Sequence, residues 1–146
     1  MSRFAREHVG KVWDELTPLM IANHAEAALT PKLNPKRAMF EMLEGAGVLR
    51  MFVSRGTDGS INGFATFIVV EHMILSATVA VQQAIYVKPE CRGSLSGRFL
   101  KWMDEQLAAE SVDQIQRSVR WEDQKFAFAL DKMGYSHDET VFIRRF

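Results

Sequence analysis

The stretch AVQQAIYVKPECRGSLSGRFLKWM, residues 80–103, decides the fold of this chain. It predicts a buried strand over residues 81–87, a sharp exit at Pro89, and a loop of small residues over 92–97 that opens a helix. Backbone N–H groups at the start of a helix have no intrahelical partner and lie at the positive end of its dipole. A strand that leads through such a loop into a helix therefore forms a candidate binding site for an anion, often a phosphate.

The residue types of this loop suit an anion. Its two glycines leave room for a ligand beside the backbone, its two serines offer hydroxyl donors, and an arginine stands at either end. These residues are Gly93, Gly97, Ser94, Ser96, Arg92 and Arg98. An evenly weighted alternative is a plain connection between strand and helix, in which Ser94 caps the helix and no ligand binds.

Length and composition indicate one domain, residues 1–146. The chain is 47% hydrophobic and 25% charged, which is usual for a soluble globular domain. Eighteen basic residues balance eighteen acidic ones without a long block of either sign, which argues against nucleic acid or a membrane surface as a partner. No signal peptide and no membrane-spanning stretch is visible.

Cysteine and histidine usage narrows the chemistry further. Cys91 is the single cysteine, so no internal disulfide can form, and we expect a cytoplasmic protein. The four histidines lie far apart, without the spacing of metal ligands. We therefore predict no metal site.

The first part of the chain predicts two helices. Apolar residues recur every three or four positions over residues 9–20, with Pro18 as a place where one helix can end and another begin. The helical segment is expected to stop near Pro31. A second helix, with Asn34 as its cap, should end at Gly45.

The rest of the chain alternates between strands and helices. Strands are expected over residues 48–54 and 61–70, and a long run over 74–87 has a possible break at 76–78. Later elements are helices over 96–110 and 122–133 and strands over 112–121 and 135–146. The order predicts an α/β (α+β) fold with a mixed, mostly antiparallel central sheet and helices on both faces.

Two adjacent glutamines interrupt the apolar central strand. Gln82 and Gln83 point to opposite faces of the sheet unless a β-bulge intervenes. At least one of them is therefore expected to need a buried partner.

The order of elements and the segment IYVKPECRGSLSGRFLKW, residues 85–102, resemble the GNAT superfamily of N-acetyltransferases. In that family a strand ending in V-x-P-E leads into R/Q-x-x-G-x-G/A, whose backbone amides hold the pyrophosphate of acetyl-CoA. Arg92 and Gly97 stand at the first and last motif positions, and Leu95 replaces the middle glycine. The Leu95 side chain either crowds the pyrophosphate or turns toward the buried side of the helix. In its compactness the chain looks most like short, phage-encoded members.

A second motif and the cofactor contacts follow from the same resemblance. FALDKMGY, residues 128–135, resembles the family's helix that ends in glycine and an aromatic residue. Acetyl-CoA is implied as co-substrate, with a strand N–H near Ile85 polarising the thioester carbonyl. The implied cofactor-binding residues are Ile85, Val87, Arg92, Gly93, Ser94, Leu95, Ser96, Gly97, Arg98 and Asp123.

The usual catalytic side chains of the family are replaced. The family often uses a strand glutamate as base and a tyrosine as acid, whereas this chain has the glutamine pair and Leu130 at those places. The candidate substitutes are Gln83, His24, Glu26 and His72. An alternative for each is a solvated or turn residue without a catalytic role. An amine that is already neutral could react through positioning alone, which can contribute roughly 7–11 kcal/mol.

Two classes of function remain. The leading hypothesis is an acyl-CoA-dependent N-acetyltransferase that acts on a primary amine of a small molecule or protein, and the Arg92–Gly97 loop favours it. The alternative is a catalytically degenerate GNAT-fold protein that binds a protein partner, in the host cytoplasm if it is phage-encoded. Leu95, Leu130 and the glutamine pair favour this alternative, and fold alone does not decide function.

Overall fold

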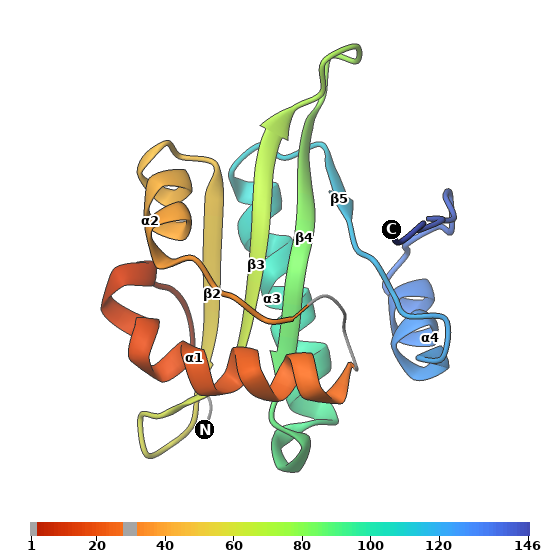
Figure 1. Cartoon of the computed structure of the whole chain (residues 1–146). Coiled ribbons are helices and arrows are strands. Elements are labelled where there is room, and N and C mark those ends of the chain that lie inside the picture. The colour runs from red at the N-terminus through yellow and green to blue at the C-terminus, as the bar shows by residue number, and fades with distance from the viewer. Residues whose placement is uncertain (1–2, 28–31) are drawn as a thin grey trace.

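The computed structural model describes residues 3–27 and 32–146, and its centre is a five-stranded sheet in the order β1-β2-β3-β4-β5 (Figure 1). The strands are β1 Arg3–Arg6, β2 Leu49–Arg55, β3 Ile61–Glu71, β4 Thr78–Val87 and β5 Gln114–Gln116. The helices are α1 Val9–Glu26, α2 Arg37–Gly45, α3 Ser94–Ala109 and α4 Gln124–Lys132, with a 3-10 turn η1 at Pro89–Cys91. Strands β1 to β4 are antiparallel and β5 is parallel to β4, so the predicted mixed sheet is confirmed.

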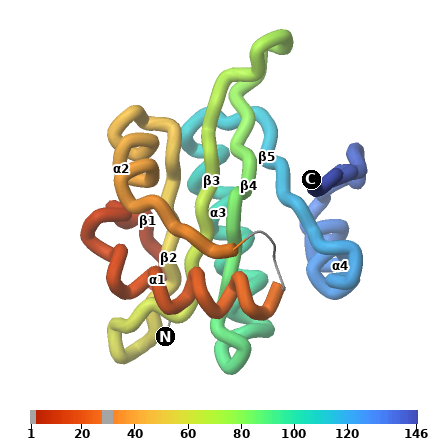
Figure 2. Tube along the Cα trace, viewed as in Figure 1, coloured from red at the N-terminus to blue at the C-terminus, as the bar shows by residue number. Residues whose placement is uncertain are grey.

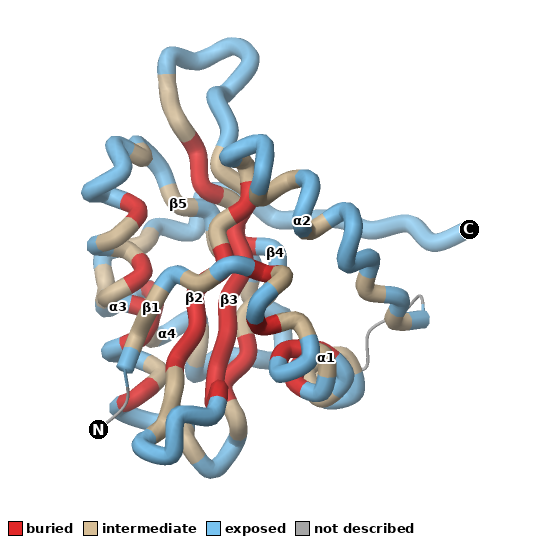
Figure 3. The backbone as a smooth tube through the Cα atoms, turned by 90° about the vertical axis from the view of Figure 1, so that its left-hand side faces the viewer, coloured by how far each residue is buried: buried red, intermediate tan, exposed pale blue. Residues whose placement is uncertain are grey.

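Each face of the sheet carries its own hydrophobic core. Neighbouring side chains of a strand point to opposite faces, so Met51 packs with α1 while Phe52 packs with α3. The face toward α1 is also flanked by α2, and the buried backbone runs along the middle strands (Figures 2 and 3). Helices therefore cover both faces, as the sequence predicts.

A β-bulge at Gln83 interrupts the pairing of β3 with β4. Thr66 pairs with Ala84 and Phe67 pairs with Gln82, so Gln83 is the extra residue on β4. Gln82 is buried and Gln83 is exposed. The prediction that one glutamine needs a buried partner is confirmed, because the Gln82 Oε1 accepts a hydrogen bond from the side chain of Arg117.

Three predictions about the front helices need correction or fall outside the described residues. Pro18 lies inside α1, which runs unbroken to Glu26, and the buried face of that helix outweighs the single backbone donor that proline removes. The predicted stop near Pro31 lies outside the described residues. Helix α2 has Lys36, and not Asn34, at its N-cap position, although it ends at Gly45 as predicted.

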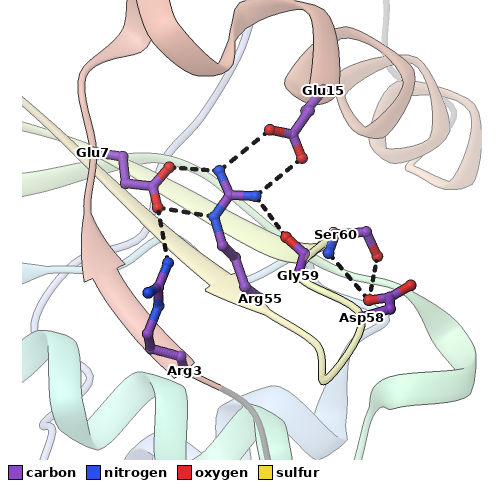
Figure 4. Close-up of polar contacts among 7 residues, drawn as sticks. All are labelled: Arg3, Glu7, Glu15, Arg55, Asp58, Gly59 and Ser60. Carbon is purple, nitrogen blue, oxygen red and sulfur yellow. Dashed lines mark hydrogen bonds and ion pairs between the residues drawn. The ribbon is translucent and has the colours of Figure 1, made fainter.

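The edge strand β1 was not predicted from the sequence, since it is four residues long and has no clear alternation. An ion-pair cluster joins it to its neighbours (Figure 4). Arg55, at the end of β2, donates to both carboxylate oxygens of Glu7 at 2.9 and 2.7 Å, and also to Glu15 of α1 at 3.1 Å. The Arg55 hydrogen bond lowers the pKa of the Glu7 carboxyl.

The end of the chain differs most from its prediction. Strand β5 covers three residues instead of the predicted 112–121. After Gln116 the backbone no longer pairs with β4, and the Arg117 side chain turns inward to bind Gln82. The predicted strand over 135–146 is absent, since this segment lies beside no strand and extends away from the body (Figures 1 and 3). The predicted break at 76–78 is confirmed, as β4 begins at Thr78. In the described part of the chain, no helix is long and apolar enough to cross a membrane.

Candidate functional site

Strands β4 and β5 lie side by side over three residue pairs and then separate (Figure 1). Val79 pairs with Gln114 and Val81 with Gln116, while β4 continues to Val87. Within residues 3–27 and 32–146, the β4 edge that faces away from β3 has no strand partner over 83–87. Its N–H and C=O groups can therefore pair with an extended ligand, as an added strand would.

The start of α3 lies directly beyond this open edge. Gly93 is the N-cap residue, with φ 97° and ψ −126°, a conformation that favours glycine, and no side chain caps the helix. The first backbone bond of the helix runs from Gly97 N to Gly93 O at 3.4 Å. The N–H groups of Ser94, Leu95 and Ser96 precede it and have no acceptor within the helix. The prediction that Ser94 is the cap is therefore wrong, since Ser94 is the first helical residue.

The replacement of the motif's middle glycine by Leu95 leaves the loop open. The Leu95 side chain is 6% exposed and packs with Phe99 in the core between α3 and the sheet. Of the two alternatives for this residue, the structure has the buried one. A Cβ atom placed on Gly97 would meet no neighbouring segment within 4 Å, so there is open space beside this residue.

Arg92 joins the loop to β4 and α1. Its Nε donates to the Val87 carbonyl at 2.8 Å, and its Nη2 donates to Glu26 Oε2 at 2.6 Å. The guanidinium also lies 5.6 Å from the centre of the Tyr86 ring. The hydrogen bond that Arg92 donates to Glu26 raises the Arg92 pKa, and Asp123 adds a smaller electrostatic effect in the same direction. Two predicted site residues, Arg92 and Glu26, are thus in direct contact.

The other predicted residues are dispersed. Arg98 faces a separate cavity of about 510 Å³, which Lys88 and Cys91 also line. His24 lies in the last turn of α1, close in sequence to Glu26. The Asp123 carboxylate caps α4, because its Oδ1 accepts from Phe126 N at 3.0 Å.

His72 lies at the far end of β4 from these residues. Its Nδ1 accepts hydrogen bonds from the backbone N–H groups of Ile74 and Leu75, at 3.2 and 3.0 Å, in the β3–β4 turn. The five steps of strand from Thr78 to Gln83 span about 16 Å. His72 is therefore not brought together with Gln83 or Glu26, and the catalytic roles of all four candidates stay predictions.

A buried polar cluster below the separated strands was missed by the sequence analysis. The Arg117 side chain has no exposed surface and donates to Asp104 Oδ1 at 2.7 Å, Tyr135 Oη at 3.0 Å and Gln82 Oε1 at 2.5 Å. It also lies 5.1 Å from the centre of the Phe67 ring. Burial raises the pKa of Tyr135 to about 12. The need of Gln82 for a buried partner was the one signal that pointed to this cluster.

Comparison with known proteins gives matches among solved structures only. No family model and no curated protein matches the chain. A ribosomal-protein-alanine N-acetyltransferase from Brucella melitensis biovar Abortus 2308 is 18% identical, with a TM-score of 0.77 over all of both chains. The aminoglycoside acetyltransferase meta-AAC0020 from an uncultured soil metagenomic sample, in complex with sisomicin, is 13% identical, with a TM-score of 0.77 over 99% of this chain and 95% of its own.

A third solved structure contains the co-substrate that the sequence analysis names. It is a predicted acetyltransferase with acetyl-CoA from Clostridium acetobutylicum, 9% identical, with a TM-score of 0.79 over 99% of this chain and 96% of its own. This chain has the GNAT acetyltransferase fold. The GNAT fold is therefore confirmed, while the likeness to phage-encoded members receives no support from these structures. Across the described ranges, no group of three or more His, Cys, Asp or Glu side chains could hold a metal ion.

Proposed function

We propose that this chain is an acyl-CoA-dependent N-acetyltransferase, which transfers the acetyl group of acetyl-CoA to a primary amine. The observation that carries the proposal is the unpaired edge of β4 beside the uncapped, open start of α3. An extended chain of amides followed by a diphosphate needs these two features in this order. Acetyl-CoA has that chemistry, and a solved structure with the same fold contains it.

The start of α3 would hold the diphosphate. The N–H groups of Ser94, Leu95 and Ser96 supply three donors at the positive end of the helix dipole. Gly97 allows close approach, since no protein atom lies where its side chain would be. Because the Leu95 side chain is buried in the core, the missing glycine of the motif does not obstruct this surface.

The open edge of β4 would hold the pantetheine amides, with the acyl group near the bulge. Ile85 lies two residues beyond Gln83, on the part of β4 that β5 does not cover. A backbone N–H here would donate to the thioester carbonyl oxygen, and this bond strengthens as negative charge develops on that oxygen. Acetyl-CoA supplies the activated acyl group; the chain supplies its position and the donor.

The acceptor amine must reach the acyl carbon without a proton. Glu26 is the candidate that the structure connects to the cofactor loop, through Arg92, and we assign it the role of proton acceptor. Gln83 has no group that takes up a proton at neutral pH, and its exposed amide would orient the amine. The proposal covers amines of small molecules and of proteins alike.

A second candidate function rests on a separate observation. The chain has Leu130, which is buried, where the family's tyrosine is expected, and Gln82 is committed to Arg117. A protein that had lost its chemistry but kept its fold would show these replacements, and it would act by binding a protein partner. Cofactor binding and turnover separate the two functions.

The decisive experiment measures the thermal unfolding of the chain with and without acetyl-CoA. At a hundred times its dissociation constant, a ligand stabilises the folded state by about 2.7 kcal/mol. Gly97→Trp should fold, since there is space at this position, but should lose the stabilisation. The matched control Cys91→Ala, facing the separate cavity, should keep it.

Release of CoA with a panel of primary amines then tests turnover. Binding without turnover on any amine, together with a captured protein partner, would favour the second function. Absence of binding at millimolar acetyl-CoA would overturn the transferase proposal.

A further inference from the structure

The turn between β3 and β4 exposes three consecutive apolar side chains. Met73 is 98% exposed, Ile74 is 86% exposed, and Leu75 follows them. The hairpin projects well beyond the other strands (Figure 1). His72 Nδ1 accepts hydrogen bonds from two backbone N–H groups of the turn. These bonds hold the backbone that carries the apolar side chains in one conformation. We call residues 71–78 the hairpin tip.

The base of the hairpin tip is acidic. Glu71 and Asp113 line a hollow of about 240 Å³ together with Leu75. Asp113 Oδ2 accepts from Thr78 N at 2.7 Å, which fixes this carboxylate at the start of β4. The tip itself contains no lysine or arginine. It therefore offers an apolar surface with negative charge beside it.

A second uncovered surface has the opposite charge. Residues 140–146, TVFIRRF, which we call the arm, lie outside the sheet and are exposed. Phe142 is 92% exposed, and Arg144 lies 4.9 Å from the centre of the Phe146 ring. The arm thus combines large apolar side chains with two arginines. A group of exposed apolar side chains beside charged residues is typical of an interaction site.

We propose that the arm of one copy binds the hairpin tip of a second copy, whose own arm binds the hairpin tip of the first. The two surfaces match, since apolar side chains meet apolar side chains and the two arginines meet Glu71 and Asp113. In a single copy the two surfaces lie apart, since the hairpin projects at the top of the view and the end of the chain extends to the side (Figure 3). A two-fold pair covers both surfaces on both copies and closes the assembly.

The free edge of β5 is a less suitable place for the arm. Arg120 follows β5 and is exposed, so positive charge would lie beside Arg144 and Arg145. Like charges placed opposite each other in a strand pair are destabilising. The acidic hairpin tip carries no such penalty.

Sedimentation velocity of the full chain from 1 to 200 µM tests the proposal, and we expect a monomer–dimer equilibrium that weakens as salt rises. The double variant R144E/R145E should weaken the dimer at least tenfold, and Ile74→Asp should do the same from the other side. Adding Glu71→Lys to R144E/R145E should recover part of the loss. Lys125→Glu, which changes an exposed cation on α4, should leave the equilibrium unchanged.

Mixing the Ile74→Asp chain with the R144E/R145E chain restores one intact contact. The mixed dimer should be tighter than either variant alone and weaker than the unsubstituted dimer. A monomer at 200 µM would overturn the proposal, and so would a dimer that neither variant weakens. A monomer whose arm amides are protected from hydrogen exchange would show that the arm binds its own chain, which also overturns it.

Discussion

The Arg117 guanidinium donates to the Asp104 carboxylate at 2.7 Å and thereby fastens the chain beyond β5 to α3. Tyr135 completes the connection, since its hydroxyl donates to the second Asp104 oxygen at 2.8 Å and accepts from Arg117 Nε at 3.0 Å. Tyr135 follows α4, a helix with one buried residue. The cluster therefore fixes the position of α4, the helix that follows β5 beyond the point where β4 and β5 separate (Figure 1).

Arg117→Met should destabilise the fold strongly. It leaves Asp104 Oδ1 and the buried Gln82 Oε1 without their charged donor, and such a loss typically costs about 3 kcal/mol. Urea unfolding at pH 7 measures the difference. The matched change Arg120→Met removes an exposed pair with Glu122 at 3.8 Å and should cost less than about 0.5 kcal/mol. Equal effects of the two variants would contradict a structural role for the cluster.

Tyr135 should make stability sensitive to alkaline pH. Its pKa is about 12 in the folded protein against an ordinary value of 10.0, so folding favours the neutral hydroxyl. The resulting stabilisation is complete below pH 10 and is lost as the pH rises toward 12. The difference in unfolding free energy between the unsubstituted chain and Tyr135→Phe should therefore shrink over this range. A difference that stays constant from pH 9 to pH 12 would exclude the effect.

Glu7 should make the stability of the fold sensitive to acidic pH. Arg55 lowers the Glu7 pKa below its ordinary 4.5, so the stabilisation is present above pH 4.5 and is lost as the pH falls through the lower folded value. Glu7→Gln should cost about 1–2 kcal/mol at pH 7 and progressively less below pH 4. Chemical denaturation at several pH values provides the measurement. A cost that does not change with pH would show that packing, and not charge, is responsible.

Glu26→Gln should separate cofactor binding from turnover, provided that the transferase proposal holds. The Arg92–Glu26 pair is half-exposed, so its loss frees Arg92 for a diphosphate and should tighten acetyl-CoA binding by no more than about fivefold. The same change removes the assigned proton acceptor and should lower kcat at least tenfold. Calorimetric titration and a kcat–pH profile provide the two readouts.

Glu90→Gln is the control for that experiment, because Glu90 is a nearby carboxylate on η1 that faces the separate cavity. It should change neither quantity by more than twofold. If Glu26→Gln lowers kcat but leaves the pH profile unchanged, Glu26 is not the proton acceptor.

Local sequence determined most of the secondary structure and the centre of the candidate site. The apolar runs of β2 and β3, the apolar stripe of α3 and the small-residue loop after Pro89 are encoded within a few neighbouring residues. Those patterns were sufficient to predict the mixed sheet and the loop between β4 and α3, where anion binding stays a proposal. They failed for β1 and for residues 135–146, since a short or peripheral segment becomes a strand only where a neighbouring strand accepts its backbone hydrogen bonds.

Only the tertiary structure decided which side chains meet. The partner of Gln82 is 35 positions away in the sequence and the partner of Arg92 is 66 positions away, so no local pattern could identify either. The direction of Leu95 likewise depended on the core that β4 and α3 enclose. Periodicity acts between near neighbours in the chain, whereas burial and ion pairing act between segments that only the fold brings together.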